Sequence, residues 1–295
     1  MSDSPRTRLR ACRSFLLTPG SRPEKFAGAD AGDGIIIDLE STVAPVDKGR
    51  ARDAALAFLR QPADRALARI VRVNSPRSVD GLRDLLALHE SGLCPDAVII
   101  PKCESADEVR LVIDVLDGSQ SGIGIVPMIE LARAVFAADR IAGAHERVLG
   151  LFLGGGDLAA DLGAEGAWEN LLYARSCMVA AAATTGIAAI DVPYFKADAE
   201  GLKAEATASR KLGMTGKAAL HAEQLAAINT VFTPAPDAVA RARSVLAAST
   251  NGTHPPVLNG HVVEPAMVRE AERVLAIAAR LEIGSSATAQ PALAG

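Results

Sequence analysis

Residues 124–157 read GIVPMIELARAVFAADRIAGAHERVLGLFLGGGD, and this stretch contains the unit from which the fold is built. Two short apolar runs flank a segment with helical spacing over 132–142. Apolar runs without polar alternation are typical of parallel strands that are covered on both faces. The runs lead to Glu130 and Asp157, so the stretch predicts a strand–helix–strand unit with an acidic residue after each strand.

The same alternation occurs eight times in succession between residues 14 and 230. The predicted strands are 14–19, 34–40, 68–74, 97–102, 124–130, 148–153, 188–192 and 216–221. The predicted helices are 22–31, 46–60, 79–90, 106–116, 132–142, 168–185, 200–212 and 223–230. Eight such units in 295 residues favour an α/β fold of the closed (β/α)8 barrel type. A doubly wound open sheet is the alternative, but Thr18-Pro-Gly-Ser21 is not the phosphate loop expected after its first strand.

The pattern changes after about residue 232, which divides the chain into a barrel over 1–232 and a C-terminal helical extension over 233–295. The extension is predicted to contain an Ala-rich helix up to about Ala248 and a second helix over 265–281, followed by a disordered tail from Gly284. It has few residues with which to build a core. We therefore expect it to pack on a barrel, in particular that of a neighbouring subunit.

Composition excludes several classes of function. The formal net charge of −4, with acidic and basic residues mixed along the chain, argues against a nucleic-acid partner. No apolar stretch reaches membrane-spanning length, and no signal peptide is expected. The four cysteines lack a Cys-x-x-Cys pair, so we expect reduced, mostly buried thiols in a cytoplasmic protein. Four arginines precede the first strand (Arg6, Arg8, Arg10 and Arg13), and a solvated start is favoured there over a binding arm.

In a barrel of this type the active site lies at the carboxyl ends of the strands. Charged or polar residues stand at or near seven of these ends: Asp38 and Glu40, Arg72 and Asn74, Lys102, Glu130, Asp157, Asp191, and His221. Packing alone does not explain why apolar strands should end in this way.

Glu130 and Asp157 are the predicted metal ligands. They follow adjacent strands, and two carboxylates without neighbouring His or Cys suit a hard cation such as Mg²⁺. The Gly154–Gly156 run lets the backbone approach closely. The alternative, which spacing leaves equally open, is that both acids cap helices or pair with arginines.

The remaining strand-end residues have one functional and one structural interpretation each. Arg72 is a candidate anchor for a substrate carboxylate, or a salt-bridge partner of Asp38 or Glu40. A desolvated Lys102 could form a Schiff base, although neighbouring carboxylates would keep it protonated. His221 is a base or, as the favoured interpretation, a structural histidine. Asp191 is an outer ligand or a cap.

An ordered series of short motifs points to one family. They are Pro19-Gly20 with Lys25; Ile37-Asp-Leu-Glu40; Pro45 with Lys48 and Ala51-Arg52; Arg72-Val-Asn74; Pro101-Lys102; Glu130; Gly154 with Gly156-Asp-Leu158; Leu212-Gly213 with Gly216-Lys217; His221 with Gln224; and Asn229 with Phe232 and Pro234. In this order the chain resembles the HpcH/HpaI aldolase–citrate lyase family, in particular its citrate lyase beta-subunit-like branch.

The resemblance implies a Mg²⁺-dependent lyase that cleaves or forms 3-hydroxyacyl thioesters such as malyl-, citramalyl- or citryl-CoA. The products of cleavage would be acetyl-CoA and a 2-oxo acid. It implies that Glu130 and Asp157 bind Mg²⁺ and that Arg72 and Glu130 contact the substrate, and we add Glu40 and Lys102 to the substrate-binding residues. Homotrimers or hexamers are implied, with the C-terminal segment reaching a neighbouring site.

The chain departs from the family pattern at three positions. Ser41 follows Glu40 where an Asp is usual, and Ala222 follows His221 where a Pro is usual. The C-terminal segment presents Glu264 before Pro265, where relatives carry an acid/base Asp. Glu264 is therefore a candidate catalytic acid/base, or a charge at a helix N-terminus.

Three rival functions stay open from the sequence. One is a thioester hydrolase on the same scaffold, and another is a metal-dependent aldolase for free 2-oxo acids. The third is a non-catalytic or carrier-dependent subunit of a larger lyase complex.

Overall fold

A computed structural model describes residues 4–62, 67–117, 122–250 and 255–287. Eight parallel strands close into a barrel in sequence order, with β1 paired to both β2 and β8. The strands are β1 (Ser14–Pro19), β2 (Gly34–Asp38), β3 (Ala68–Arg72), β4 (Ala97–Ile100), β5 (Gly124–Ile129), β6 (Gly150–Leu153), β7 (Ala188–Asp191) and β8 (Gly216–Ala219). The predicted (β/α)8 barrel is confirmed, and the open sheet is excluded.

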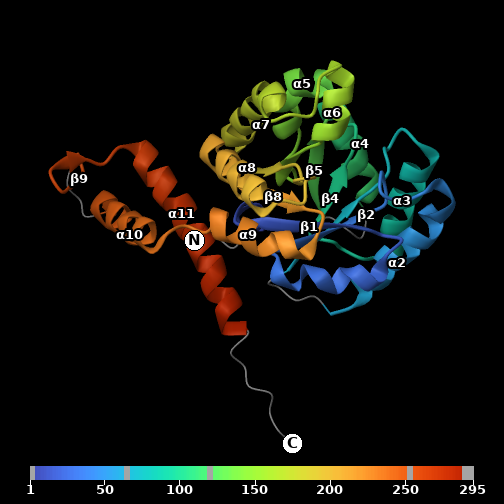
Figure 1. The fold of residues 1–295 in the computed structure, drawn as a ribbon, viewed down its shortest axis with the longest axis horizontal. Coiled ribbons are helices and arrows are strands. Elements are labelled where there is room, and N and C mark those ends of the chain that lie inside the picture. The colour runs from blue at the N-terminus through green and yellow to red at the C-terminus, as the bar shows by residue number, and fades with distance from the viewer. Residues whose placement is uncertain (1–3, 63–66, 118–121, 251–254, 288–295) are drawn as a thin grey trace, which may run out of the picture. The chain divides into compact units, whose positions relative to one another are not determined.

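Helices cover the outside of the barrel (Figure 1). They are η1 (Pro23–Ala31), η2 (Pro45–Asp47), α2 (Lys48–Arg60), α3 (Val79–Ser91), α4 (Ala106–Leu116), α5 (Ala132–Ala142), α6 (Gly155–Leu162), η3 (Glu169–Leu171), α7 (Leu172–Thr185), α8 (Ala199–Leu212) and α9 (Ala222–Phe232). Those labelled η are 3-10 helices, so the first predicted α-helix is instead a 3-10 segment. The short helix α6 was not predicted.

The strands separate two apolar cores. One fills the barrel interior with alternate strand residues, among them Ile36, Ile70 and Met128. The other lies between the sheet and the helices and contains the intervening residues, among them Ile37 and Val71. Because side chains alternate along a strand, each of its last residues points either into the barrel interior or toward the helices.

The N-terminal residues close one end of the barrel, which corrects the expectation of a solvated start. Helix α1 (Pro5–Arg10) places Leu9 in the interior core together with Cys12. The guanidinium of Arg6 donates to backbone carbonyls after α5 and at the end of α7, and that of Arg13 donates to Asp33 at 2.7 and 2.8 Å. The arginines therefore fasten the amino ends of the strands.

The described residues from Thr233 onward, 233–250 and 255–287, belong to a second compact unit. It contains α10 (Pro236–Thr250), the short strands β9 (Val257–Leu258) and β10 (His261–Val262), and α11 (Pro265–Ala287). Helices α10 and α11 share an apolar core of their own that includes Val245, Val263 and Val274, contrary to our expectation. Helix α11 extends beyond the predicted end at Leu281, and residues 288–295 of the predicted tail lie outside the described part.

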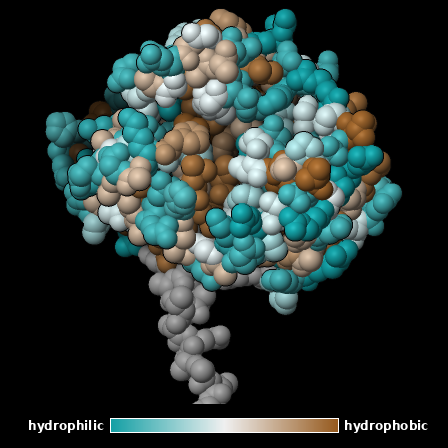
Figure 2. Space-filling view, turned by 45° about the vertical axis from the view of Figure 1, so that its right-hand side comes forward, coloured by the Kyte–Doolittle hydropathy of each residue, from teal (hydrophilic) through white to brown (hydrophobic). Residues whose placement is uncertain are grey.

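The surface is mixed in character. Figure 2 shows mainly hydrophilic residues on the face in view, with scattered hydrophobic ones and a hollow whose walls are hydrophobic. In the described part of the chain, no helix is both long enough and apolar enough to cross a membrane. The four cysteines are free thiols, but only Cys12 and Cys103 are buried, so the expectation that most would be buried holds for half of them.

Candidate active site

Arg72 and Asp38 form a buried ion pair at the carboxyl ends of β3 and β2. Arg72 Nε and Nη2 donate to the two carboxylate oxygens of Asp38 at 2.6 and 2.7 Å. Burial alone would raise the pKa of Asp38, but the Arg72 guanidinium holds that pKa below its usual value. The structure thus confirms the predicted salt bridge, and the pair fixes the plane of the guanidinium.

The rest of the guanidinium faces the barrel mouth. Nη2 also donates to Ser41 Oγ at 2.7 Å, and Nη1 lies 3.5 Å from Glu40 Oε2 and 3.9 Å from Met128 Sδ. Ser41, which departs from the family pattern, therefore takes part in positioning Arg72. The predicted salt bridge and the predicted role as a substrate anchor are compatible, because Nη1 makes only the longer contacts and can still donate to an anion.

A polar network behind the site fixes the loop that follows β2. Lys48 Nζ donates to the carbonyls of Leu39 and Glu40 and to Asn74 Oδ1, at 2.5 to 2.7 Å. The buried Asp84 accepts the backbone and side-chain N–H groups of Asn74 at 2.8 and 2.7 Å. The ends of β2 and β3 are therefore held at a fixed separation.

Lys102 connects three acidic residues. Its backbone N–H donates to Glu130 Oε1 at 2.6 Å, and its Nζ lies 3.3 Å from both Glu40 Oε1 and Asp157 Oδ2. Its backbone has a φ of 54°, in the left-handed region that residues with a Cβ seldom adopt. Partial burial lowers the pKa of Lys102, but Glu40, Glu130 and Asp157 outweigh this and raise it. The ammonium of Lys102 is therefore held protonated, as expected from the neighbouring carboxylates, and this disfavours a Schiff base.

Glu130 is almost completely buried, with 1% of its surface exposed. Burial raises its pKa to about 7, and the charges of Asp157 and Glu40 add to this effect. Gly154 packs directly against it, since a Cβ at position 154 would lie 2.3 Å from both Cβ and Oε2 of Glu130. The glycine run was predicted to let the backbone approach a ligand closely, and it packs directly against the side chain of Glu130.

Asp157 lies in the first turn of α6, directly after the Gly154–Gly156 run that follows β6. Its side chain is 47% exposed and its contact is with Lys102. The N-terminus of α5 is capped by Asp161, which accepts the N–H of Ala132 at 2.7 Å. Glu130 does not have the capping role of the alternative interpretation.

The donor set suits a hard cation. Glu130 accepts the backbone N–H of Lys102, Asp157 lies beside the ammonium group of the same residue, and the charge of Asp157 raises the pKa of Glu130. Within the described ranges, no three His, Cys, Asp or Glu side chains gather as a complete metal site. Two carboxylates with open positions for water and substrate are a usual arrangement for Mg²⁺.

One candidate residue, Asp191, lies away from this group. Asp191 is fully buried between the sheet and the helices, paired with Arg175 at 3.0 Å and with Lys217 at 2.9 Å. It is neither an outer metal ligand nor a cap. His221 is exposed, and its backbone N–H donates to Gln224 Oε1 at 3.3 Å. Glu264 precedes α11 in the second compact unit, whose placement relative to the barrel is not defined.

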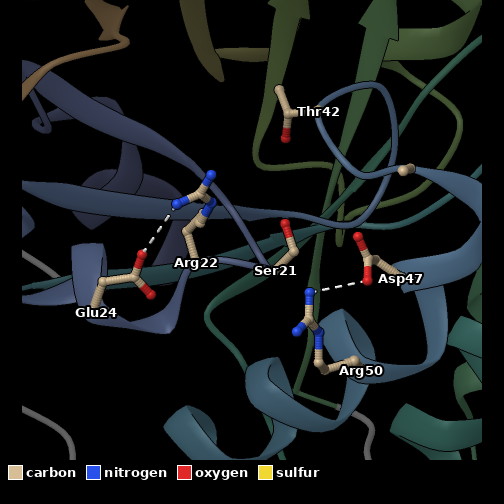
Figure 3. A pocket seen from close by; sticks show the side chains of 7 residues that line it. Ser21, Arg22, Glu24, Thr42, Asp47 and Arg50 are labelled. Atoms are coloured by element: carbon tan, nitrogen blue, oxygen red, sulfur yellow. Dashed lines mark hydrogen bonds and ion pairs between the residues drawn. The ribbon is translucent and has the colours of Figure 1, made fainter.

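A polar cavity of about 550 Å³ adjoins the Arg72 pair, because its lining residue Thr42 hydrogen-bonds to Asp38 at 2.9 Å through its N–H. Figure 3 shows Arg22 and Arg50 at this cavity, each with an acidic partner, Glu24 and Asp47. The cavity follows β1 and β2 at the same end of the barrel. The sequence reasoning did not single out these arginines, although Arg22 directly follows the Thr18–Ser21 motif.

Comparisons with known proteins agree on one family. The sequence model of the HpcH/HpaI aldolase/citrate lyase family matches residues 13–222. L-malyl-CoA/beta-methylmalyl-CoA lyase of Rhodobacter capsulatus is 34% identical over 302 residues, covering 91% of this chain and 94% of the relative. Citrate lyase subunit beta of Escherichia coli K12 is 32% identical over 282 residues, covering 90% and 93%.

A solved structure has the same fold. CitE of Mycobacterium tuberculosis, in complex with magnesium, acetoacetate and coenzyme A, is 32% identical and superimposes with a TM-score of 0.72. The match covers 92% of this chain and 100% of that one.

Proposed function

This chain belongs to the HpcH/HpaI aldolase/citrate lyase family, and from that premise we propose that it is a Mg²⁺-dependent carbon–carbon lyase. Its substrates would be 3-hydroxyacyl-CoA thioesters of the malyl-, citramalyl- or citryl-CoA type. The observation that supports this best is that Lys102 contacts Glu130 through its backbone N–H and Asp157 through its Nζ. Beside them lies the guanidinium of Arg72, whose Nη1 makes only longer contacts. The related CitE structure contains magnesium and coenzyme A, as this assignment requires.

Each residue has a defined task in this proposal. Glu130 and Asp157 would hold Mg²⁺, which when bound supplies a Lewis acid for the carbonyl of the 2-oxo acid portion. Arg72 is oriented by Asp38 before any substrate arrives, so its Nη1 edge can stabilise developing negative charge without reorganisation. Lys102 and Glu40 would line the same space and hold the polar part of the substrate.

The nucleotide part of the thioester needs a second region. The 550 Å³ cavity with Arg22 and Arg50 is polar and lies next to the Arg72 pair, so it suits the phosphates of coenzyme A. Glu264 is proposed as the acid/base that exchanges the hydroxyl proton, supplied by the C-terminal unit of another subunit in a trimer or hexamer. The free thiols support a cytoplasmic location.

The test is a product assay. Protein with Mg²⁺ and malyl-CoA or citramalyl-CoA should release a 2-oxo acid together with acetyl-CoA. Glu130→Ala should reduce the rate by about 100-fold or more, the effect of losing one group that stabilises the transition state. Asp107→Ala, which removes an exposed carboxylate on α4, should leave the rate unchanged. Free CoA appearing before any 2-oxo acid, or equal rates for the two variants, would contradict the lyase assignment.

A further inference from the structure

We propose that Arg77, outside the barrel mouth in the loop between β3 and α3, is a positioning residue that aims the Lys102 peptide at Glu130. The inference rests on the proposed function, because it concerns a residue that supports the proposed magnesium site. It assigns a task to a half-exposed arginine that neither the motifs nor the strand-end pattern singled out.

The guanidinium of Arg77 binds a backbone carbonyl in the turn after β4 and two acidic side chains that follow it. Its Nη2 donates to the carbonyl oxygen of Lys102 at 2.5 Å. Its Nη1 donates to Glu104 Oε1 at 2.5 Å and lies 3.2 Å from Glu108 Oε1. The three acceptors surround one planar guanidinium, which gives the turn a defined orientation.

The turn needs such support because Lys102 is strained. Its φ of 54° is unfavourable for a residue with a Cβ, and such a conformation persists only where surrounding contacts enforce it. The neighbouring peptide is fixed from the other side, where Glu104 N–H donates to Glu108 Oε2 at 2.6 Å. Arg77 closes this arrangement by fixing the carbonyl of Lys102.

The left-handed turn determines what Lys102 presents to the site. Its N–H reaches Glu130 at 2.6 Å, and its Nζ reaches Asp157 at 3.3 Å. If the turn relaxed to an ordinary φ, the N–H would turn away from Glu130. The carboxylate would then lose its short hydrogen bond and its fixed orientation. Groups that orient metal ligands in this way typically contribute a factor of about 10 to 100 in metal affinity.

The direction in which Mg²⁺ affinity changes distinguishes a positioning role of Arg77 from a purely electrostatic one. Removing a cation from the rim makes the potential around Glu130 more negative, which by Coulomb's law tightens the binding of Mg²⁺ or leaves it unchanged. Loss of positioning has the opposite effect. Arg133 provides the matched control, because it pairs with Glu104 at 3.3 Å and is 77% exposed, while that ion pair does not involve the Lys102 peptide.

The experiment is calorimetric titration of MgCl₂ into the full-length wild type, Arg77→Gln, Arg77→Lys and Arg133→Gln. We expect Arg77→Gln to weaken Mg²⁺ binding by about 10-fold, the low end for groups that orient a ligand. Arg77→Lys should recover part of the loss, and Arg133→Gln should bind as tightly as the wild type or more tightly. Thermal midpoints of all variants should stay within about 2 °C, as for exposed substitutions.

A second background tests the route through Lys102. Glycine adopts a positive φ freely, so Arg77→Gln should weaken Mg²⁺ binding less in a Lys102→Gly protein than in the wild type. Unchanged or tighter binding by Arg77→Gln, or equal weakening by Arg133→Gln, would overturn the inference alone. A wild type that binds no Mg²⁺ would overturn the proposed function and this inference together.

Discussion

Glu130 is buried, and its carboxyl group accepts a hydrogen bond from the backbone N–H of Lys102. The folded protein keeps the carboxyl protonated up to about pH 7, whereas the ordinary pKa is 4.5. Between these values the folded state binds more protons than the unfolded state. The free energy of unfolding of the metal-free protein should therefore fall as the pH rises through this window.

This gives a prediction for Glu130→Gln, a neutral variant of nearly equal shape. Without metal, the wild type should lose about 3 kcal/mol of stability relative to the variant between about pH 4.5 and pH 7. Guanidinium unfolding at several pH values in the presence of a chelator measures the difference, and the other titrating groups cancel. Parallel stability profiles would show that Glu130 is ionised throughout.

The parity of each strand decides which of the candidate residues face the mouth of the barrel. Asp38, Arg72 and Glu130 each lie two residues after a side chain of the barrel interior, namely Ile36, Ile70 and Met128, so they point into the mouth. Asp191 directly follows the interior residue Ile190 and therefore points to the helices. The strand-end rule alone could not make this distinction, because one residue of register reverses the direction.

At the scale of elements, a buried ion network joins β7 and β8 to the helices α7 and α8. Lys217 on β8 is fully buried and donates to Asp191, to the carbonyl of Val192 and to Glu205, at 2.6 to 2.9 Å. Arg175 on α7 pairs with Asp191 and stacks 4.2 Å from the centre of the Trp168 ring. Burial would raise the pKa of Asp191, but Lys217 and Arg175 lower it further than burial raises it.

Lys217→Met should therefore destabilise the protein by about 3 kcal/mol, the lower end for a broken buried pair, since Arg175 still compensates Asp191. Urea unfolding measures this effect. The control is Arg110→Gln, which breaks the exposed Arg110–Asp107 pair on α4 and should cost about 0.5 kcal/mol or less. Similar losses in the two variants would mean that the network does not stabilise the barrel.

The boundaries of the elements show what local patterns can and cannot predict. Helices α4 and α5 begin and end where the apolar spacing predicts. The 3-10 form of η1 and the short helix α6 were missed, because both follow tight turns containing Pro or Gly whose effect on the next residues depends on tertiary contacts. Helix α1 was missed because arginines mask its single buried residue, Leu9.

At the scale of the whole molecule, the question is which subunit supplies Glu264. If the C-terminal unit of one chain completes the site of another, Glu130→Gln and Glu264→Gln should each be inactive alone. Mixed after partial denaturation and refolding, they should regain part of the activity, because some sites then combine an intact Glu130 with an intact Glu264. Active Glu264→Gln protein, or a mixture that stays inactive, would argue against this arrangement.

The eightfold repeat made the architecture predictable, while the second unit was harder to predict. Half of the buried residues in its core are alanines, namely Ala242, Ala248 and Ala271, which contribute little apolar signal to a helix face. The grouping of the strand-end residues at one rim could be predicted because a closed parallel barrel brings all strand ends together whatever lies between them.

Closure of the barrel has a consequence for synthesis of the chain. Strand β1 pairs with β2 and with β8, so one of its edges must wait until Gly216–Ala219 has left the ribosome. Until then the nascent sheet has two open edges and an apolar interior, features that invite aggregation. We expect the newly made protein to depend on chaperones until β8 emerges, and truncations within α8 to be recovered as insoluble material.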